Sequence, residues 1–326
     1  MELNYNKVLE VGLFSWAKQE GVWKYILGYF IYLLAILVAT SYVMYSVLKP
    51  FLTINSTSGL AGLASISYLI VFLLAASIVS LIIQSAFSYL FIAKALNSSG
   101  RKFVEFDLGR WVKFIVLEIM TSIAVVLSLF NLKLLLVGLA ALACMVIAFI
   151  ALAFTSLLVF IIFLLLGALL GLAYFVIMVY NAIKLSMGCV SYVESEKGII
   201  EALKDSWNLT GGSTLNVFIG LFLIGLIVGI IVGIGMLPSM IYNFVNSVTN
   251  IAASNSLAYM VDPVYFLLSV LYLVLQAVGS LIICFGMIEI YNQLKGIKKA
   301  SHFGAAKKAA HGTTVRRSFA KKRKLK

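Results

Sequence analysis

Long apolar segments separated by short polar stretches dominate the pattern along this chain. Six segments contain about 20 residues or more, enough to cross a hydrocarbon core about 30 Å thick. They cover residues 25–48, 66–93, 111–130, 134–180, 215–237 and 265–290. Since backbone polar groups must be satisfied internally in lipid, the pattern predicts an all-α fold, a polytopic transmembrane helix bundle with about six crossings.

Lysines and arginines near the helix ends predict the orientation of these crossings. They cluster in residues 94–113 and 184–204, whereas residues 50–65 and 238–262 contain none. Basic residues near helix ends favour the cytoplasmic side. We therefore expect a multi-pass protein of the cell membrane with both termini in the cytoplasm.

The fourth apolar segment is too long for a single crossing. With this orientation, residues 111–181 begin and end on the cytoplasmic side and must cross an even number of times. We expect two crossings, with the surplus in a tilted, broken or re-entrant helix. Four crossings, which would give eight in total, are the alternative.

The two ends of the chain differ in character from the spans. Residues 4–18 have an amphipathic pattern that predicts an interfacial helix at the start of a transmembrane domain covering residues 1–294. Its apolar face consists of Tyr5, Val8, Leu9, Leu13 and Trp16. Residues 295–326 are basic, with few apolar side chains to bury, and we expect them to form a disordered cytoplasmic tail.

Charge and composition show what this tail can bind. The chain is 63% hydrophobic and 11% charged, which excludes a water-soluble globule, and twelve of its 25 lysines and arginines follow Glu289. We expect the tail to bind anionic lipid headgroups at the cytoplasmic face. The densest basic run is Lys321, Lys322, Arg323 and Lys324. Nucleic acid is the less favoured partner, because only Phe303 and Phe319 are available to stack on bases.

The sequence contains no constellation that indicates a reaction. His302 and His311 lie nine residues apart in the tail, with no cysteine or carboxylate nearby. Cys144, Cys189 and Cys284 lie far apart, within or beside apolar segments, and are typical of small buried hydrophobes. We therefore expect a non-catalytic protein without a metal site or cofactor.

Polar residues within the spans are few. Glu118 follows Lys113 by one to two turns and Glu289 lies near Lys295, so we expect both carboxylates to reach the interface. The deeper polar side chains are Gln84, Asn181 and Gln276. Such amides typically form hydrogen bonds between helices. The alternative is a polar cavity shared by all three, which would favour a transporter.

Two glycine patterns predict close helix packing. Gly225, Gly229 and Gly233 follow one another at four-residue spacing in the fifth segment, and Gly167 and Gly171 do so in the fourth. Glycines on one face let another backbone approach closely. We expect contacts between neighbouring helices or between subunits of a homo-oligomer, with a substrate groove as the alternative.

The most specific stretch is residues 192–212, YVESEKGIIEALKDSWNLTGG. It predicts a surface helix that ends at a glycine pair before the fifth span. The characteristic residues are Glu201, Ala202, Leu203, Ser206, Trp207, Leu209, Thr210 and Gly211. In this order they resemble the membrane domain associated with glycerophosphoryl diester phosphodiesterases and the YciC-like family of uncharacterised integral membrane proteins. The resemblance implies six helices preceded by an interfacial helix, and covers about 25 residues at motif level.

The chain departs from that family in two respects. Residues 134–180 lack the Pro-Gly break that is common in the middle of the bundle. The catalytic chemistry of such proteins belongs to a separate soluble domain, and none lies within these residues. The resemblance therefore implies a fold and no reaction. A structural or lipid-interacting role in the cell envelope is our first hypothesis, and a permease-like transporter of a small or lipid-like solute is the second.

Overall fold

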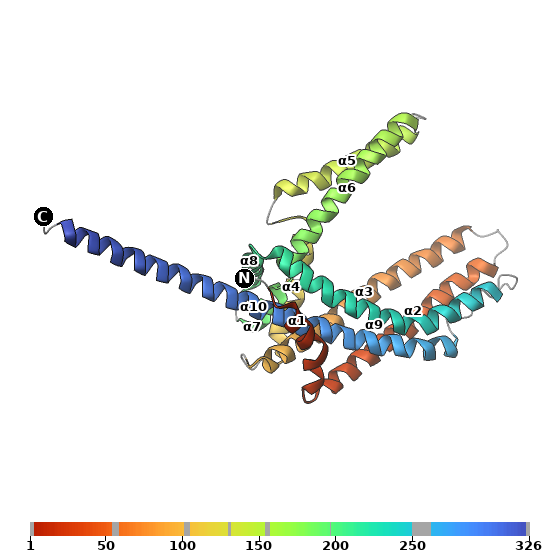
Figure 1. Cartoon of the computed structure of the whole chain (residues 1–326). Coiled ribbons are helices and arrows are strands. Elements are labelled where there is room, and N and C mark those ends of the chain that lie inside the picture. Colours follow the sequence, from red (N-terminus) through yellow and green to blue (C-terminus); the bar gives the residue numbers. More distant parts are fainter. Residues whose placement is uncertain are drawn as a thin grey trace.

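The computed structural model describes the backbone of residues 3–53, 59–100, 105–129, 132–153, 157–195, 197–249 and 262–323. The side chains of residues 47–53, 59–66 and 298–323, and of a few neighbouring positions, fall outside the description. Every described element is helical, which confirms the all-α prediction (Figure 1). The elements are α1 (Tyr5–Glu10), a π-helical turn (Val11–Ser15), a 3-10 turn (Trp16–Lys18), α2 (Val22–Thr53), α3 (Gly59–Ser98), α4 (Leu108–Val126), α5 (Leu132–Ala153), α6 (Leu157–Leu185), α7 (Gly188–Glu194), α8 (Ile199–Thr210), α9 (Thr214–Thr249) and α10 (Pro263–Arg323).

Six helices in the described part of the chain are long and apolar enough to span a membrane, namely α2, α3, α5, α6, α9 and α10. The protein is therefore a multi-pass membrane protein. The expected crossing at residues 111–130 is not among them, because α4 carries Arg110, Lys113 and Glu118 on only 19 residues. Instead, the long apolar segment supplies two spans, α5 and α6. The surplus helix that we expected in this region is α4.

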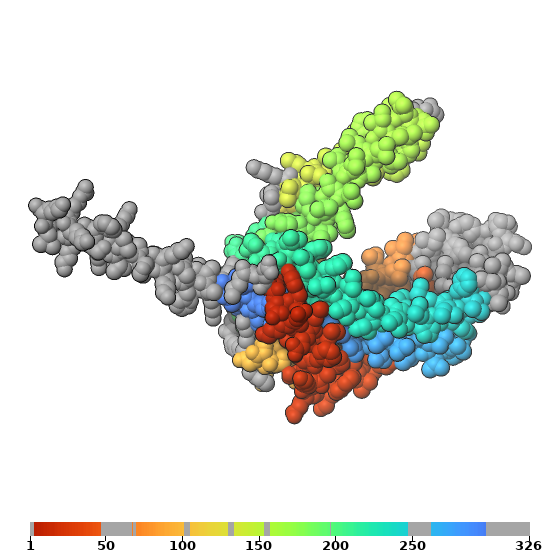
Figure 2. Space-filling model, in the orientation of Figure 1, coloured from red at the N-terminus to blue at the C-terminus, as the bar shows by residue number. Residues whose placement is uncertain are grey.

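The spans form two groups (Figure 1). Helices α2, α3, α9 and α10 run side by side, whereas the α5–α6 hairpin extends in a different direction. The space-filling view shows the same separation, with the hairpin standing away from the rest of the chain (Figure 2). Helices α4 and α8 lie where the two groups meet and contact both, and α7 packs beside them against α3 and α10.

The largest fully buried side chains gather at this junction. They include Tyr89 and Phe91 of α3, Phe114 of α4, and Phe285 and Tyr291 of α10. The outward faces of the spans remain apolar and exposed, as expected for surfaces that lipid tails solvate. The densely packed core is thus located at one end of the spans.

Close packing of α9 on α10 depends on glycines that the sequence pattern did not single out. A Cβ atom added at Gly279 would lie 2.7 Å from Cγ1 of Val228, and one at Gly235 would lie 3.1 Å from the Tyr272 Cα. By contrast, a Cβ at Gly225, Gly229 or Gly233 would have no neighbour within 4 Å in the described chain. Packing of α9 within the chain therefore does not use the predicted glycine row, and contact through it with another subunit stays a prediction.

Polar contacts fix the N-terminal segment to α10. The Lys7 ammonium lies 3.0 Å from the Glu289 carboxylate, and the Asn4 backbone N–H donates to Oε1 of Gln293 at 2.7 Å. The π-helical turn places Gly12 against α10, where an added Cβ would lie 3.3 Å from the Ile282 carbonyl oxygen. Glu289 therefore pairs with Lys7. Its expected neighbour, Lys295, pairs with Glu194 of α7.

A topology test follows from the assignment of α5 and α6 as spans. Reporter fusions after residues 131, 155 and 184 should report cytoplasmic, external and cytoplasmic locations, respectively. The reason is that α5 and α6 would each cross once while α4 would not. Alkaline phosphatase and fluorescent-protein activities of the fusions provide the measurement, and an external location for residue 184 would contradict this topology.

A second test uses two glycines in the close-packed pair of helices. Substituting Gly279→Val should destabilise the fold by about 1–3 kcal/mol, because the β-branched Val228 has little freedom to move away. Gly229→Val is the matched control, since open space surrounds that position. Thermal unfolding of the detergent-solubilised protein should show a lower midpoint for Gly279→Val alone. Equal midpoints would contradict the packing described.

Candidate functional site

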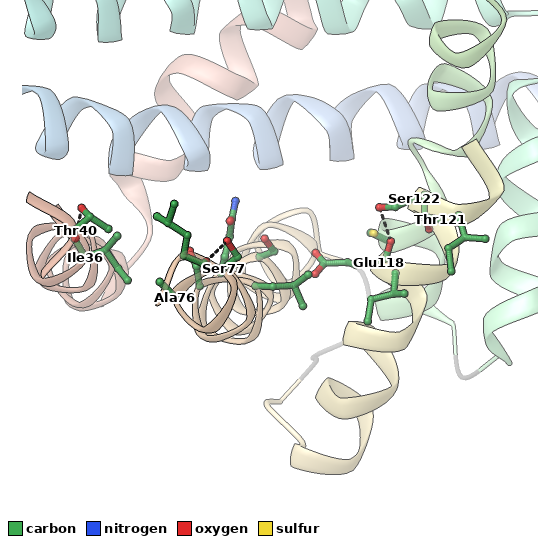
Figure 3. Close-up of a pocket in the computed structure, with 15 residues that line it drawn as sticks. Ile36, Thr40, Ala76, Ser77, Glu118, Thr121 and Ser122 are labelled. Atoms are coloured by element: carbon green, nitrogen blue, oxygen red, sulfur yellow. Dashed lines mark hydrogen bonds between the residues drawn. The ribbon is translucent and has the colours of Figure 1, made fainter. Parts of the chain in front are cut away.

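A cavity of about 850 Å³ lies between α2, α3 and α4 and is open on one side (Figure 3). Its walls combine apolar and polar side chains. The polar ones are Thr40 of α2, Ser77, Ser80, Gln84 and Ser88 of α3, and Glu118, Thr121 and Ser122 of α4. Glu118 is the one charged residue among the lining residues.

The α3 wall is a polar stripe along one helical face. Ser77, Ser80, Gln84 and Ser88 follow one another at spacings of three or four residues, which places them in one row. The Ser80 hydroxyl lies 2.5 Å from the Tyr32 hydroxyl of α2, which joins the two walls. This spacing was visible in the sequence, because serines recurring at helical spacing in an apolar segment mark a shared face.

Contacts at both ends hold α4 in place. At its start, the Asp107 carboxylate accepts hydrogen bonds from the backbone N–H groups of Gly109 and Arg110, and the Trp111 indole donates to Ser85 of α3 at 3.1 Å. At its end, the Tyr174 hydroxyl of α6 donates to the carbonyl of Val126. The side chains of α4 that line the cavity therefore project from a helix fixed to α3 and α6.

Glu118 points from α4 toward α3 (Figure 3). It also lines a second cavity of about 240 Å³, together with Gln84, Cys189 of α7 and Cys284 of α10. In the described part of the chain, its carboxylate has no hydrogen-bond or ion-pair partner. The sequence-based expectation that Glu118 reaches the interface near Lys113 stays a prediction. Glu118 lies at the level of Gln84, well along α3.

Burial changes the protonation of this group. Helix α4 is outside the six candidate spans, and desolvation raises the pKa of the Glu118 carboxyl to about 7. Gln84 and Ser88 of α3, Cys189 and Cys284 face it across the second cavity, and none of them is basic. The carboxyl is therefore poised to change charge near neutral pH.

The predicted polar cavity contains only one of its three amides. Gln84 lines the α2–α3–α4 cavity, whereas Asn181 of α6 donates to the Ser128 hydroxyl at 2.9 Å. Ser128 has a φ of 49°, a conformation that a residue other than glycine rarely adopts, and Asn181 holds it at the end of α4. Gln276 lies on α10 and is not among the lining residues of either cavity. The three amides are not brought together.

The family-like motif forms a clasp between α8 and the end of α6. The Ser206 hydroxyl donates to the Lys184 carbonyl oxygen at 2.8 Å and accepts from the Met187 backbone N–H at 3.1 Å. The Thr210 hydroxyl donates to the same carbonyl oxygen at 3.2 Å. The three apolar residues of the motif, Ala202, Leu203 and Leu209, are buried. These contacts give the motif a structural function, which is to fold α8 onto the turn between α6 and α7.

The remaining motif residues occupy the outer side and the end of α8. Glu201 is exposed, the Trp207 ring covers the Lys184 side chain, and Gly211 begins the turn to α9. Gly212 has a φ of +81°, which is why a glycine is required there. The Ile200 side chain is 60% exposed, because the buried face of α8 runs through Ala202 and Ser206.

The remaining predicted sites are the glycine pair of α6 and the basic run at residues 321–324. An added Cβ at Gly167 would lie 3.3 Å from Cβ of Cys144, so this glycine packs on α5, whereas Gly171 has no neighbour within 4 Å in the described chain. The side chains of Lys321, Lys322, Arg323 and Lys324 lie outside the described residues. Lipid binding by this run, the division at residue 295 and the disorder expected beyond it stay predictions.

Comparison with known proteins finds no match to the chain among family models, curated proteins or solved structures.

Chemical labelling can test whether water enters the large cavity. In a cysteine-free background, Ser77→Cys and Thr121→Cys should react with a membrane-impermeant methanethiosulfonate, because both positions line an open cavity. Ser191→Cys is the control, since Ser191 is 2% exposed and lines neither cavity. Mass spectrometry measures the modified fraction. Protection of Ser77→Cys and Thr121→Cys to the level of Ser191→Cys would show that the cavity is closed to water.

Proposed function

We propose that this multi-pass membrane protein binds a small amphiphilic or lipid-like solute in the α2–α3–α4 cavity, through a cationic or hydrogen-bond-donating group. One observation carries the proposal, namely the carboxylate of Glu118, which has no partner in the described part of the chain and lines an open cavity of about 850 Å³. Among the two functions considered from the sequence, this supports the permease-like one.

The size and the position of the cavity support binding. Ligand sites in proteins typically enclose about 300–1,000 Å³, and the volume found here lies in that range. A buried carboxyl without a partner is energetically costly, and such groups often mark functional sites. A solute that donates hydrogen bonds or carries positive charge would compensate the buried carboxylate.

The composition of the walls supports an amphiphile. Gln84 and the serine and threonine hydroxyls around Glu118 can bind a polar group. Apolar side chains make up much of the remaining surface, and they are Ile36, Leu73, Ala76, Leu81, Ile119 and Ile123. A molecule with one polar end and one apolar end satisfies both parts of this lining.

The proposal retains several of the sequence-based expectations. It assigns no reaction, and it places the chain in the cell membrane with both termini in the cytoplasm. Membership in the YciC-like family is part of the same proposal, supported by the motif and the layout of the helices. A structural role in the envelope is the alternative.

Native mass spectrometry of the protein extracted with its own lipids provides the first test. We expect a species retained in fixed stoichiometry, and displacement of that species by added tetrabutylammonium as a cationic probe. Glu118→Gln should weaken retention of the probe by at least about tenfold, which corresponds to about 1.4 kcal/mol. Glu105→Gln is the matched control, because Glu105 is exposed and lines neither cavity.

Two outcomes would contradict the proposal. One is retention of bulk lipid alone, with no displaceable species, which would favour the structural role. The other is equal loss of the probe in both variants, which would show that the charge of Glu118 has no particular part in binding.

The pH dependence of binding provides a second test. Because burial raises the pKa of Glu118 to about 7, its carboxyl is ionised above that pH and neutral below it. Affinity for tetrabutylammonium should therefore fall as the pH decreases through about 7 and recover as it rises. Glu118→Gln should bind weakly and without this dependence. Titrations of both proteins between mildly acidic and mildly basic pH supply the measurement, and a dependence that survives in Glu118→Gln would assign it to another group.

A further inference from the structure

A second charged side chain lacks an oppositely charged partner in the described chain. Lys184, in the last turn of α6, is 6% exposed, and the described ion pairs of lysines involve Lys7, Lys197 and Lys295. Its ammonium instead lies 5.3 Å from the ring centre of Trp207 and 5.6 Å from that of Tyr180. Two aromatic faces stabilise the cation without neutralising its charge.

The surroundings of Lys184 keep the ammonium accessible. An added Cβ at Gly211 would lie 3.7 Å from the Lys184 Nζ, and 3.1 Å and 3.6 Å from the carbonyl oxygens of Asn208 and Trp207, so the glycine leaves a small space between the charge and the end of α8. Within the described part of the chain, Nζ has no hydrogen-bond partner, and the atom is not fully enclosed. The ammonium thus has donors available for an incoming group.

The start of α9 adds a second source of positive potential. This 36-residue helix begins at Thr214, three residues after Gly211. The first backbone N–H groups of a helix have no partner within it and carry partial positive charge, a combination that favours anions. The ammonium of Lys184, which belongs to α6, therefore lies beside the short turn at Gly211 that leads into α9.

Lys184 is also located where a span should meet the membrane surface. Helix α6 has 29 residues and is about 44 Å long at 1.5 Å per residue, longer than the hydrocarbon core. Its last turn therefore lies at the interface, where tyrosine and tryptophan are enriched. Basic pockets between membrane helices at this level suit lipid headgroups.

We propose that Lys184, Trp207 and the start of α9 form a binding site for a phosphate-bearing anion. This site is separate from the Glu118 cavity and does not depend on its function. A phosphate fits because its oxygens accept hydrogen bonds from both the ammonium and the backbone N–H groups. The phosphate belongs either to an anionic lipid headgroup or to a soluble molecule, and the experiment distinguishes these two sources.

The experiment uses the full chain in nanodiscs of phosphatidylcholine with or without phosphatidylglycerol. Native mass spectrometry should detect phosphatidylglycerol retained by the wild type, and Lys184→Gln should reduce its retention at least about tenfold. Lys184→Arg should restore it, because the charge is kept. Lys204→Gln is the control, since this lysine of α8 is exposed and removing it changes the net charge equally. Equal retention by Lys184→Gln and Lys204→Gln would overturn the proposal.

A second measurement uses the wild type, so that it does not depend on the folding of a variant. Acetylation of Lys184 by a lysine-reactive reagent should slow when the anion is bound, whereas that of Lys204 should not. Protection by phosphatidylglycerol nanodiscs alone identifies a lipid headgroup, and equal protection by inorganic phosphate in phosphatidylcholine nanodiscs identifies a soluble anion. Absence of protection by both would overturn the proposal.

Discussion

The packing of α10 is the interaction on which the rest of this structure depends. This helix contacts the N-terminal segment, α2, α3, α7, α8 and α9. Within the spans, glycines such as Gly279 let α10 approach α9 closely. Because lipid provides no hydrophobic driving force between helices, this close van der Waals packing stabilises the pair. Beyond the apolar part, Glu289, Gln293 and Lys295 form polar contacts with α1 and α7. One helix therefore sets the register of elements from both ends of the chain.

The charged residues of α4 distinguish it from the candidate spans, and the position of α4 shapes the α2–α3–α4 cavity. A helix with Arg110, Lys113 and Glu118 on 19 residues does not meet the requirements of a span. It packs instead where the two groups of spans meet, held by contacts with α3 and α6. This position directs Glu118 and Thr121 toward the serines of α3. The charged residues of α4 thus exclude it from the candidate spans, and one of them, Glu118, lines the cavity.

Two charges of opposite sign that have no ion-pair partner in the described chain underlie the two proposed binding sites. Glu118 lines a cavity among hydroxyl and amide groups, which suits a cationic or hydrogen-bond-donating solute. Lys184 lies between two aromatic rings beside the start of α9, which suits a phosphate. The hydrogen bonds of Ser206 and Thr210 to the Lys184 carbonyl oxygen hold α8 so that Trp207 lies over Lys184. The motif in residues 201–211 therefore acts through packing and hydrogen bonds.

The sequence by itself determined the class of fold, the number of apolar spans and the helical segment at the N-terminus, because segment length and periodicity are local properties. It also contained the polar stripe of Ser77, Ser80, Gln84 and Ser88, since helical spacing alone puts these residues on one face. Only the tertiary structure decided that α4 packs against α3 and α6, that Gln84 meets Glu118 while Asn181 caps α4, and that Gly279 rather than Gly229 faces a neighbouring helix. These outcomes depend on which helix faces pack together, and that choice is set by side-chain shape between segments distant in sequence.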